Sequence, residues 1–385
     1  MRFVLSTTVQ AHTFDVAREL QRRSALAGLL TGMPRSRLAR RGLCGPEVLS
    51  FPLPVLAGMA ARRLVMSQAF ELRSEAPPKA AFDRWAARNL PEGDIFIATS
   101  SCGLETGRRA KSRGMLWVCD RPCSHILAQD RLLREEYELQ GARWPGISKT
   151  IIDRELAEYD EADRILVPSR FAERSFLDHG TDPAKIWRLP YGVDLTRFTP
   201  GDTGKSDRFR VLYAGQKTHQ KGIAYLLTAF DLLRKPGKEL LIVGSESPET
   251  SELLSRAACT NVRTVPSVPR ETLARFMASS HALVLPSIQE GLALVQAEAM
   301  ACGCPVIATT NTGGEDLFTD GLEGFIVPIR DPLAIAERLQ QLADDPDLQR
   351  NMAGRARASV QSLGGWATYV DRLIELARCQ TEAAA

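Results

Sequence analysis

Long hydrophobic runs and a strong net charge are both missing from this sequence. No stretch of the 385 residues approaches the roughly 18–20 uninterrupted apolar residues that a membrane-spanning helix needs. The first eight residues contain one strand-like run followed by polar residues, which is too short for a secretory signal. A formal net charge of +3 is too small to indicate nucleic acid as a partner. We therefore expect a cytoplasmic protein that does not bind nucleic acid.

The cysteines also lack a pattern. None of the eight has the C-x-x-C spacing of a metal site, since Cys119 and Cys123 are four positions apart and Cys302 and Cys304 only two. Several lie within apolar strands or at helix ends, where a free buried thiol is common. We expect free thiols and no metal site, with a structural metal or a disulfide set as the alternative.

What the sequence does contain is a regular alternation of short apolar runs and helical patterns. Strand-like runs at residues 2–5, 95–98 and 116–119 alternate with helical patterns at 14–23 and 104–111. This order is typical of parallel sheets with crossover helices. The length suits two such domains, and a polar tract at residues 201–207 marks the linker between them. We therefore predict α/β domains at residues 1–200 and 201–365 and a final helix over residues 366–385.

Two glutamates, Glu290 and Glu298, are the most informative pair. An apolar run at residues 282–287 predicts a strand, Glu290-Gly291 a turn, and residues 292–301 a helix. If the helix geometry extended over the eight residues, at ~100° each, the two carboxylates would lie within ~80° of each other around the helix axis and ~12 Å apart along it. Backbone N–H groups between them would face an anion; they belong to Gly291, Leu292, Ala293 and Leu294. Sugar, phosphate and ribose fit this arrangement; ordinary surface glutamates are the alternative.

A second loop carries lysines. It runs from Gly215 through Gln216 and Lys217 to Lys221, between a predicted strand and a predicted helix at residues 223–233. The helix dipole and a cationic side chain would converge there on one anion, which favours phosphate binding. Solvated lysines at a helix start are the alternative.

These two segments together resemble the family 4 retaining glycosyltransferases, which have the GT-B fold of two facing Rossmann-like, doubly wound domains. Glu290 and Glu298 match the family's Glu-x7-Glu motif, and Lys221 matches the lysine of its Gly-Arg-x4-Lys-Gly loop. Gln216 stands where the family usually has arginine, which removes one positive charge. The family's paired glycines in the first domain are replaced by Gln10-Ala11, just before His12.

The resemblance implies a role for each site residue. Glu290 would hold sugar hydroxyls, Glu298 the ribose hydroxyls, and Lys221 the diphosphate. Gly313 and Gly314 match a Gly-Gly segment that lets a ligand approach the backbone. The first domain's candidates are Asp120 and His125, which follow a strand where family members carry a catalytic-site His or Asp.

The implied activity is a retaining, metal-independent transfer of sugar from a nucleotide-sugar donor, without a cofactor. The second domain would bind the donor, and the first would bind a glycan, lipid-linked or small-molecule acceptor. Arginines at positions 35, 37, 40, 41, 62 and 63 would allow peripheral association with the inner face of the membrane, although a solvated loop is the alternative. Two other functions remain open on the same fold: a nucleotide-sugar 2-epimerase and a non-catalytic partner subunit.

Overall fold

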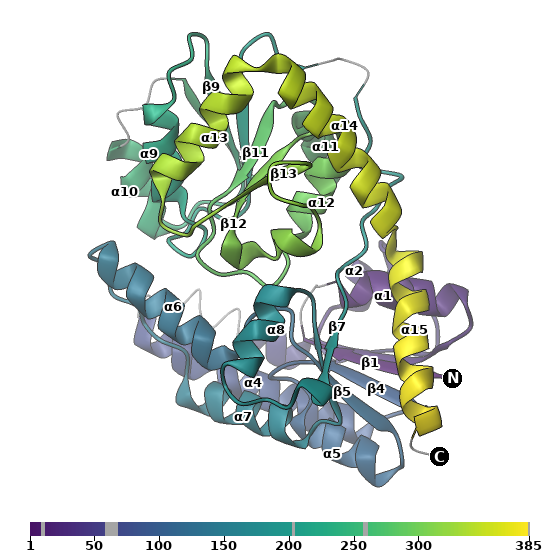
Figure 1. Ribbon diagram of the computed structural model, residues 1–385. Helices are drawn as coiled ribbons and strands as arrows, with labels where there is room; N and C mark the ends of the chain where they lie inside the picture. The colour runs from purple at the N-terminus through teal and green to yellow at the C-terminus, as the bar shows by residue number, and fades with distance from the viewer. Residues whose placement is uncertain (9–11, 58–67, 202–204, 257–260, 384–385) are drawn as a thin grey trace.

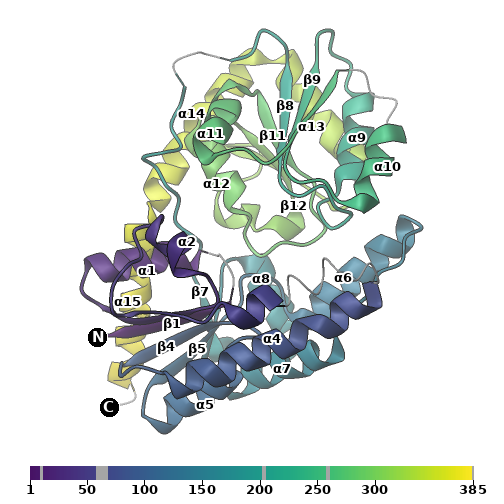
Figure 2. The same cartoon turned by 180° about the vertical axis from the view of Figure 1, so that it is seen from behind.

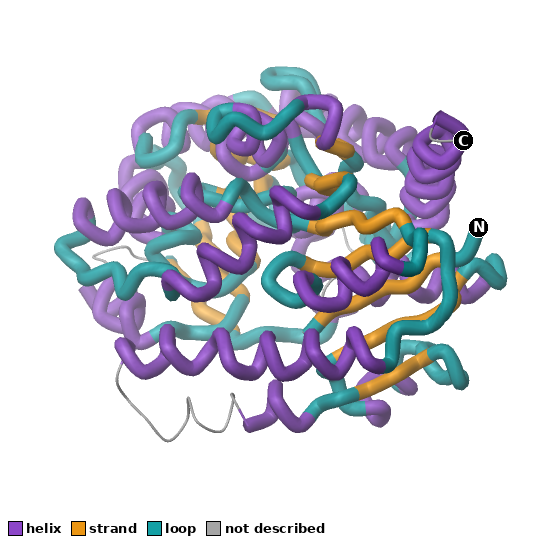
Figure 3. Tube along the Cα trace, turned by 90° about the horizontal axis from the view of Figure 1, so that it is seen from below, coloured by secondary structure: helices purple, strands orange, loops and turns teal. Residues whose placement is uncertain are grey.

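Two parallel β-sheets, each between layers of helices, make up the protein (Figure 1). The structure is a computed structural model and describes residues 1–8, 12–57, 68–201, 205–256 and 261–383. Arg62, Arg63 and Cys259 lie outside these ranges. The first sheet lies in the N-terminal half of the chain and the second in the C-terminal half, so the predicted two-domain α/β class is confirmed. Viewed from below, orange strands lie between purple helices (Figure 3).

The N-terminal sheet has seven strands in the order β3-β2-β1-β4-β5-β6-β7. Its strands are β1 (Phe3–Thr7), β2 (Leu26–Thr31), β3 (Val48–Ser50), β4 (Ile95–Thr99), β5 (Leu116–Asp120), β6 (Arg164–Val167) and β7 (Ile186–Arg188). Its helices are α1 (Thr13–Arg22), α2 (Arg35–Ala39), α4 (Gln68–Arg88), α5 (Leu104–Ser112), α6 (Ile126–Leu139), α7 (Lys149–Glu161) and α8 (Arg170–Leu177).

The C-terminal sheet has six strands in the order β10-β9-β8-β11-β12-β13. Its strands are β8 (Arg210–Ala214), β9 (Glu239–Val243), β10 (Val262–Val265), β11 (Ala282–Leu285), β12 (Val306–Thr309) and β13 (Gly324–Val327). Its helices are α9 (Ile223–Leu232), α10 (Pro248–Arg256), α11 (Arg270–Ser279), α12 (Leu294–Ala301), α13 (Pro332–Asp344) and α14 (Pro346–Leu363), and the chain ends in α15 (Trp366–Ala383).

Both sheets reverse their strand order next to their first strand. In the N-terminal sheet the reversal lies between β1 and β4, and in the C-terminal sheet it lies between β8 and β11. At such a point the loops that follow the two neighbouring strands diverge to opposite faces, and the crevice between them is where open α/β sheets bind ligands. The loop after β8 contains Lys221 and the loop after β11 contains Glu290, so the topology brings both predicted segments to this point.

Strand residues in each sheet are buried on both faces because helices cover both. In β1, Phe3 and Leu5 pack into the hydrophobic cluster on the side of α1 and α15, whereas Val4 packs into the cluster on the side of α4 and α5. This alternation follows from the two-residue period of a strand. Continuous apolar runs, rather than alternating ones, are therefore typical of these strands.

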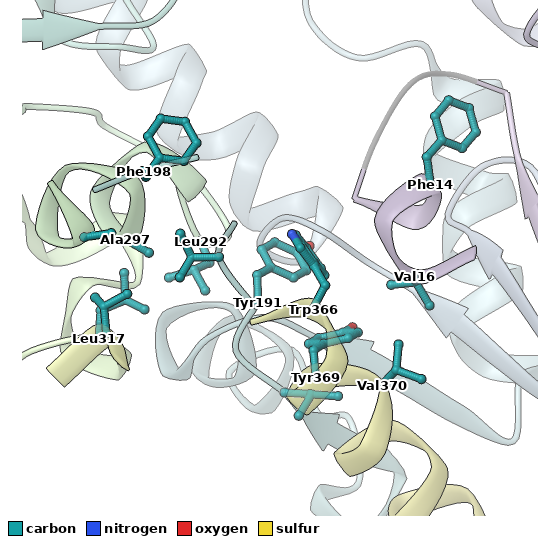
Figure 4. Close-up of a cluster of buried hydrophobic side chains, with 14 of the residues drawn as sticks. Phe14, Val16, Tyr191, Phe198, Leu292, Ala297, Leu317, Trp366, Tyr369 and Val370 are labelled. Carbon is teal, nitrogen blue, oxygen red and sulfur yellow. The ribbon is translucent and has the colours of Figure 1, made fainter. Parts of the chain in front are cut away.

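The last helix crosses back to the N-terminal domain. Helix α14 lies on the C-terminal domain, and α15 continues from it along α1 (Figures 1 and 2). Tyr369 and Val370 of α15 are buried in the cluster that also holds Phe14 of α1 (Figure 4). Arg23 at the end of α1 forms an ion pair of 3.0 Å with Asp371. This helix therefore fastens the two domains together on one side.

One predicted element was wrong at its start. Residues 292–301 were expected to be helical, but α12 begins at Leu294, and Ala293 has an extended backbone. The backbone N–H of Ala293 donates to Thr312 O at 3.3 Å instead of starting a helical turn. Glu290 lies in the turn, as predicted, but four residues before the start of α12, so the predicted helical rise and angle between the two glutamates do not apply.

Candidate functional site

Lys221 and Glu290 meet at the C-terminal ends of β8 and β11. Their side chains form an ion pair, although 69 positions separate them in the sequence. The backbone holds both in place: Lys221 N donates to Thr218 O at 3.1 Å, and Glu290 N donates to Asn311 O at 3.0 Å. Both side chains remain partly exposed. A cation and a carboxylate thus share one site at the point where the strand order reverses.

The beginning of the β8–α9 loop is tied to the neighbouring strand. Gly215 N donates to Val243 O at 2.9 Å, and the Tyr213 hydroxyl donates to the backbone carbonyl of Gln216. Lys217 is fully buried, and its Nζ lies 3.1 Å from the carboxylate of Glu246, which is exposed. The ammonium of Lys217 therefore already has an acidic partner in the β9–α10 loop.

Glu298 lies in α12 and is almost completely buried. Burial raises the pKa of its carboxyl, and the guanidinium of Arg270 opposes that shift. The two groups form an ion pair of 3.0 Å, and Arg270 is the first residue of α11. The two glutamates of the Glu-x7-Glu motif therefore have different cationic partners.

Gly291 contacts the N-terminal domain directly. Its carbonyl accepts a hydrogen bond of 2.6 Å from the Ser169 hydroxyl, at the start of α8. A Cβ atom at this glycine would lie 2.0 Å from Pro122 O, which belongs to the loop after β5. The amide of Gln289 donates to Ser124 Oγ in the same loop at 2.9 Å. The loops after β5 and β11 are thus in contact across the domain boundary, and only glycine fits at position 291.

Gly313 and Gly314 form the turn after β12. Gly313 has φ of 75°, in the left-handed region that favours glycine, and a Cβ there would lie 2.8 Å from both Gly291 O and Ser169 Cβ. Three segments therefore meet at this point: the β11–α12 loop, the β12 turn and the start of α8. Asp316, just beyond the turn, accepts from Arg170 N at 2.7 Å and reinforces this contact.

Asp120 at the end of β5 pairs with His12. The His12 Nε2 and the Asp120 carboxylate are 2.8 Å apart, and both side chains are buried. The ring of His12 also packs on that of Tyr191, with 4.4 Å between centroids. Sequence reasoning treated the two residues separately; the structure joins the loop after β1 to the end of β5 through them.

His125 has structural contacts on every side. Its Nδ1 accepts from Leu127 N at 3.3 Å and so caps α6, and its ring stacks on that of His179 with 4.2 Å between centroids. Burial, and then the charges of His179 and Arg121, lower the pKa of His125 to about 3. The imidazole is therefore neutral at physiological pH.

The low pKa of His125 predicts a pH dependence of stability. In the unfolded chain the imidazole is protonated below about pH 6.5, whereas in the folded protein it stays neutral to about pH 3. The free energy of unfolding should therefore fall as the pH drops below 6.5, by at most about 1.4 kcal/mol per pH unit from this group. Urea denaturation between pH 7.5 and about 4 measures this slope. His125→Asn, which keeps a capping acceptor but does not titrate, should have a shallower slope whatever its absolute stability; equal slopes would contradict the prediction.

Three site residues were not identified from the sequence. Arg270 pairs with Glu298, Glu246 pairs with Lys217, and Gln289 bridges the domains. Gln289 directly precedes Glu290, the first residue of the Glu-x7-Glu motif, and this position is a usable signal. Arg270 and Glu246 follow other strands, and only the fold brings them close.

The sequence also led to expectations about cysteines, metal sites and membrane-spanning helices. The described cysteines are free; Cys44 and Cys379 are exposed rather than buried. Within the described ranges, His, Cys, Asp and Glu side chains do not gather in a group that could hold a metal ion. Across these same ranges, each helix is too short or too polar to span a membrane.

Comparison with known proteins matches part of the chain to a family model and to named relatives. Residues 198–359 match the model of glycosyl transferases group 1. D-inositol 3-phosphate glycosyltransferase 1 of Catenulispora acidiphila is 31% identical over 245 residues, covering 57% of this chain and 58% of that protein. The corresponding enzyme of Kribbella flavida is 30% identical over 274 residues, covering 66% and 60%. The chain thus spans somewhat over half the length of these relatives.

Solved structures show the same fold over the whole chain. Sucrose-phosphate synthase from Thermosynechococcus elongatus superimposes with a TM-score of 0.74 at 20% identity, covering 100% of both chains. Anabaena Alr3699/HepE in complex with UDP and glucose gives 0.71 at 14% identity, covering 98% of this chain and 100% of that one. The fold is therefore GT-B, and within it the C-terminal domain carries the segment that matches glycosyl transferases group 1.

Proposed function

We propose that this protein transfers a sugar from a nucleotide-sugar donor to an acceptor hydroxyl, with retention of the anomeric configuration and without a metal ion. The observation that carries the proposal is the contact between Lys221 and Glu290 at the strand-order reversal of the C-terminal sheet. A donor diphosphate would take Lys221 as its counter-ion, and Glu290 would then be free to accept hydrogen bonds from sugar hydroxyls. The match of residues 198–359 to the glycosyl transferases group 1 model supports this assignment.

Lys221 stabilises the leaving group in this mechanism. The bond between the anomeric carbon and the diphosphate oxygen breaks, and its electron pair stays on the phosphate. Lys221 is an ammonium held close to where that charge develops, so it stabilises the transition state more than the ground state. The first backbone N–H groups of α12, which starts at Leu294, add a positive dipole end. The acceptor oxygen bonds to the anomeric carbon from the same face, and its proton passes to the departing phosphate.

Glu298 binds the donor at a distance from the reacting bond. It is nearly buried and pairs with Arg270, so ribose hydroxyls that donate hydrogen bonds to Glu298 would compete with Arg270 for its carboxylate. Asp120 and His12 lie on the opposite domain, at the end of β5 and at the start of α1. We assign them to the acceptor side, where Asp120 can accept a hydrogen bond from a hydroxyl.

The acceptor is proposed to be a small phosphorylated polyol or a related sugar. Relatives of this chain are named for glycosyl transfer to D-inositol 3-phosphate, and a UDP and glucose complex exists for a protein of the same fold. Glycan and lipid-linked acceptors remain outcomes of the acceptor screen.

A donor panel tests this function. A nucleoside diphosphate or nucleotide sugar that binds should raise stability by about 2.7 kcal/mol at 100 times its dissociation constant, and Glu298→Gln should reduce that gain. NMR of the transfer or hydrolysis product should give the anomer of the donor. Conversion of the donor to its 2-epimer without transfer would favour the epimerase. Binding without turnover, unaffected by Glu290→Gln, would favour a non-catalytic subunit.

A further inference from the structure

A cavity rich in arginine lies between the two domains. Arg270, the ion-pair partner of Glu298, forms part of its wall. The cavity volume is about 510 Å³, within the roughly 300–1,000 Å³ of small-molecule sites. Elements of both domains line it: α1, α2 with the residues after it, the segment between β7 and β8, and the start of α11. Figure 2 shows α1 and α2 below α11, on the side of the N-terminal domain that faces it. The lining residues are Asp15, Arg18, Arg37, Arg40, Arg41, Arg197, Pro269, Arg270 and Glu271.

Positive charge exceeds negative charge in this cavity. Six guanidinium groups face only two carboxylates. Three arginines already have acidic partners: Arg18 pairs with Asp15, Arg197 lies 3.1 Å from both Asp194 and Glu271, and Arg270 pairs with Glu298.

The other three arginines in the cavity wall are Arg37, Arg40 and Arg41. In the described parts of the chain, no carboxylate lies within ion-pair distance of any of them. Burial, and then the charges of Arg270, Arg18 and Arg197, lower the pKa of Arg41, although Asp15 partly opposes this. The cavity therefore holds an excess of positive charge, which an anion would stabilise.

We propose that this cavity is a binding site for a phosphate-bearing ligand, separate from the donor diphosphate site at Lys221. Guanidinium does not deprotonate, and its planar donors match phosphate oxygens in pairs. A phosphate among Arg37, Arg41 and Arg270 would contact both domains at once, and so would stabilise the arrangement in which they face each other. Arg270 would connect this site to Glu298, because it belongs to the wall of one and is the partner of the other.

Binding of inorganic phosphate, measured by calorimetric titration at constant ionic strength, tests the proposal without any transfer activity. The double variant Arg37→Gln/Arg41→Gln removes two groups without described acidic partners, so folding should not change. It should bind phosphate at least about tenfold more weakly than wild type, which corresponds to about 1.4 kcal/mol. The matched control is Arg35→Gln/Arg109→Gln, which removes the same charge from α2 and α5 outside the cavity and should bind as wild type does.

The following results decide between the proposal and its alternatives. Absence of saturable phosphate binding to wild type, or an equal loss in both double variants, overturns the proposal. Loss of phosphate binding in Lys221→Met, with retention in Arg37→Gln/Arg41→Gln, also overturns it, because the anion would then occupy the donor site. Co-sedimentation with vesicles of phosphatidylcholine and phosphatidylglycerol tests whether the bound phosphate group belongs to a lipid. If free phosphate competes with vesicle binding, the cavity is supported and its ligand is a lipid headgroup. Vesicle binding that free phosphate leaves unchanged, with no binding of phosphate itself, replaces the cavity by a membrane-facing surface. If nucleotide sugars fail to bind while phosphate still does, only the proposed transferase function is lost.

Discussion

Replacing Lys221 with methionine should lower kcat for sugar transfer by about 10²- to 10³-fold, the size of effect typical of losing one preorganised electrostatic group at a developing negative charge. Methionine keeps much of the length of the side chain but removes the ammonium that pairs with Glu290. Because Glu290 stays partly exposed, water can solvate its carboxylate in the variant, and the fold should persist. Steady-state kinetics on a donor that binds wild type, with circular dichroism for folding, measure the effect.

Lys149→Met is the matched control for Lys221→Met. Lys149 is an exposed lysine at the start of α7 and pairs with Asp153 at 2.7 Å, so it also loses one ion pair on substitution. Its kcat should equal that of wild type. If Lys221→Met lost no more activity than this control, the assignment of Lys221 to the leaving diphosphate would be wrong, whereas phosphate binding at the arginine-lined cavity could still hold.

Replacing Gly291 with alanine should separate the two domains. The new Cβ would lie 2.0 Å from Pro122 O and 2.9 Å from Cys123 N, and both are backbone atoms that cannot rotate away. Overpacking of this kind costs roughly 1–3 kcal/mol, which would shift the equilibrium constant from the domain contact described here toward separated domains by about 5- to 150-fold. kcat/KM should fall by a similar factor, because catalysis needs both domains around the donor. Small-angle scattering should show a larger radius of gyration at unchanged secondary structure.

Gly354→Ala is the control for Gly291→Ala. Gly354 lies within α14, and a Cβ there would meet nothing within 4 Å. Alanine in a helix interior is favoured over glycine by roughly 0.5–1 kcal/mol, so this variant should be slightly more stable and fully active. Unchanged scattering and activity in Gly291→Ala would mean that the contact with the loop after β5 does not govern domain closure.

The alternation of strands and helices was predictable because it depends on local pattern. Strand β5 and helix α1, for example, were placed within one or two residues, since apolar runs and amphipathic helices are set by neighbouring residues. The start of α12 was misplaced for a tertiary reason. Leucine and alanine at positions 292 and 293 favour a helix, but the hydrogen bond from Ala293 to Thr312 and the contact of Gly291 with Ser169 hold the backbone extended.

The sequence pattern could not predict which distant residues would pair with each other. The sequence alone determined the fold class, the two sheets and the presence of lysine and glutamate in loops after β8 and β11, because these follow from residue types and periods along the chain. Which partner each charge has was decided by tertiary structure: Lys217 pairs with Glu246, Glu298 with Arg270, and Asp120 with His12. These choices depend on how separate strands are ordered in a sheet and how two domains meet, and neither is encoded by local spacing.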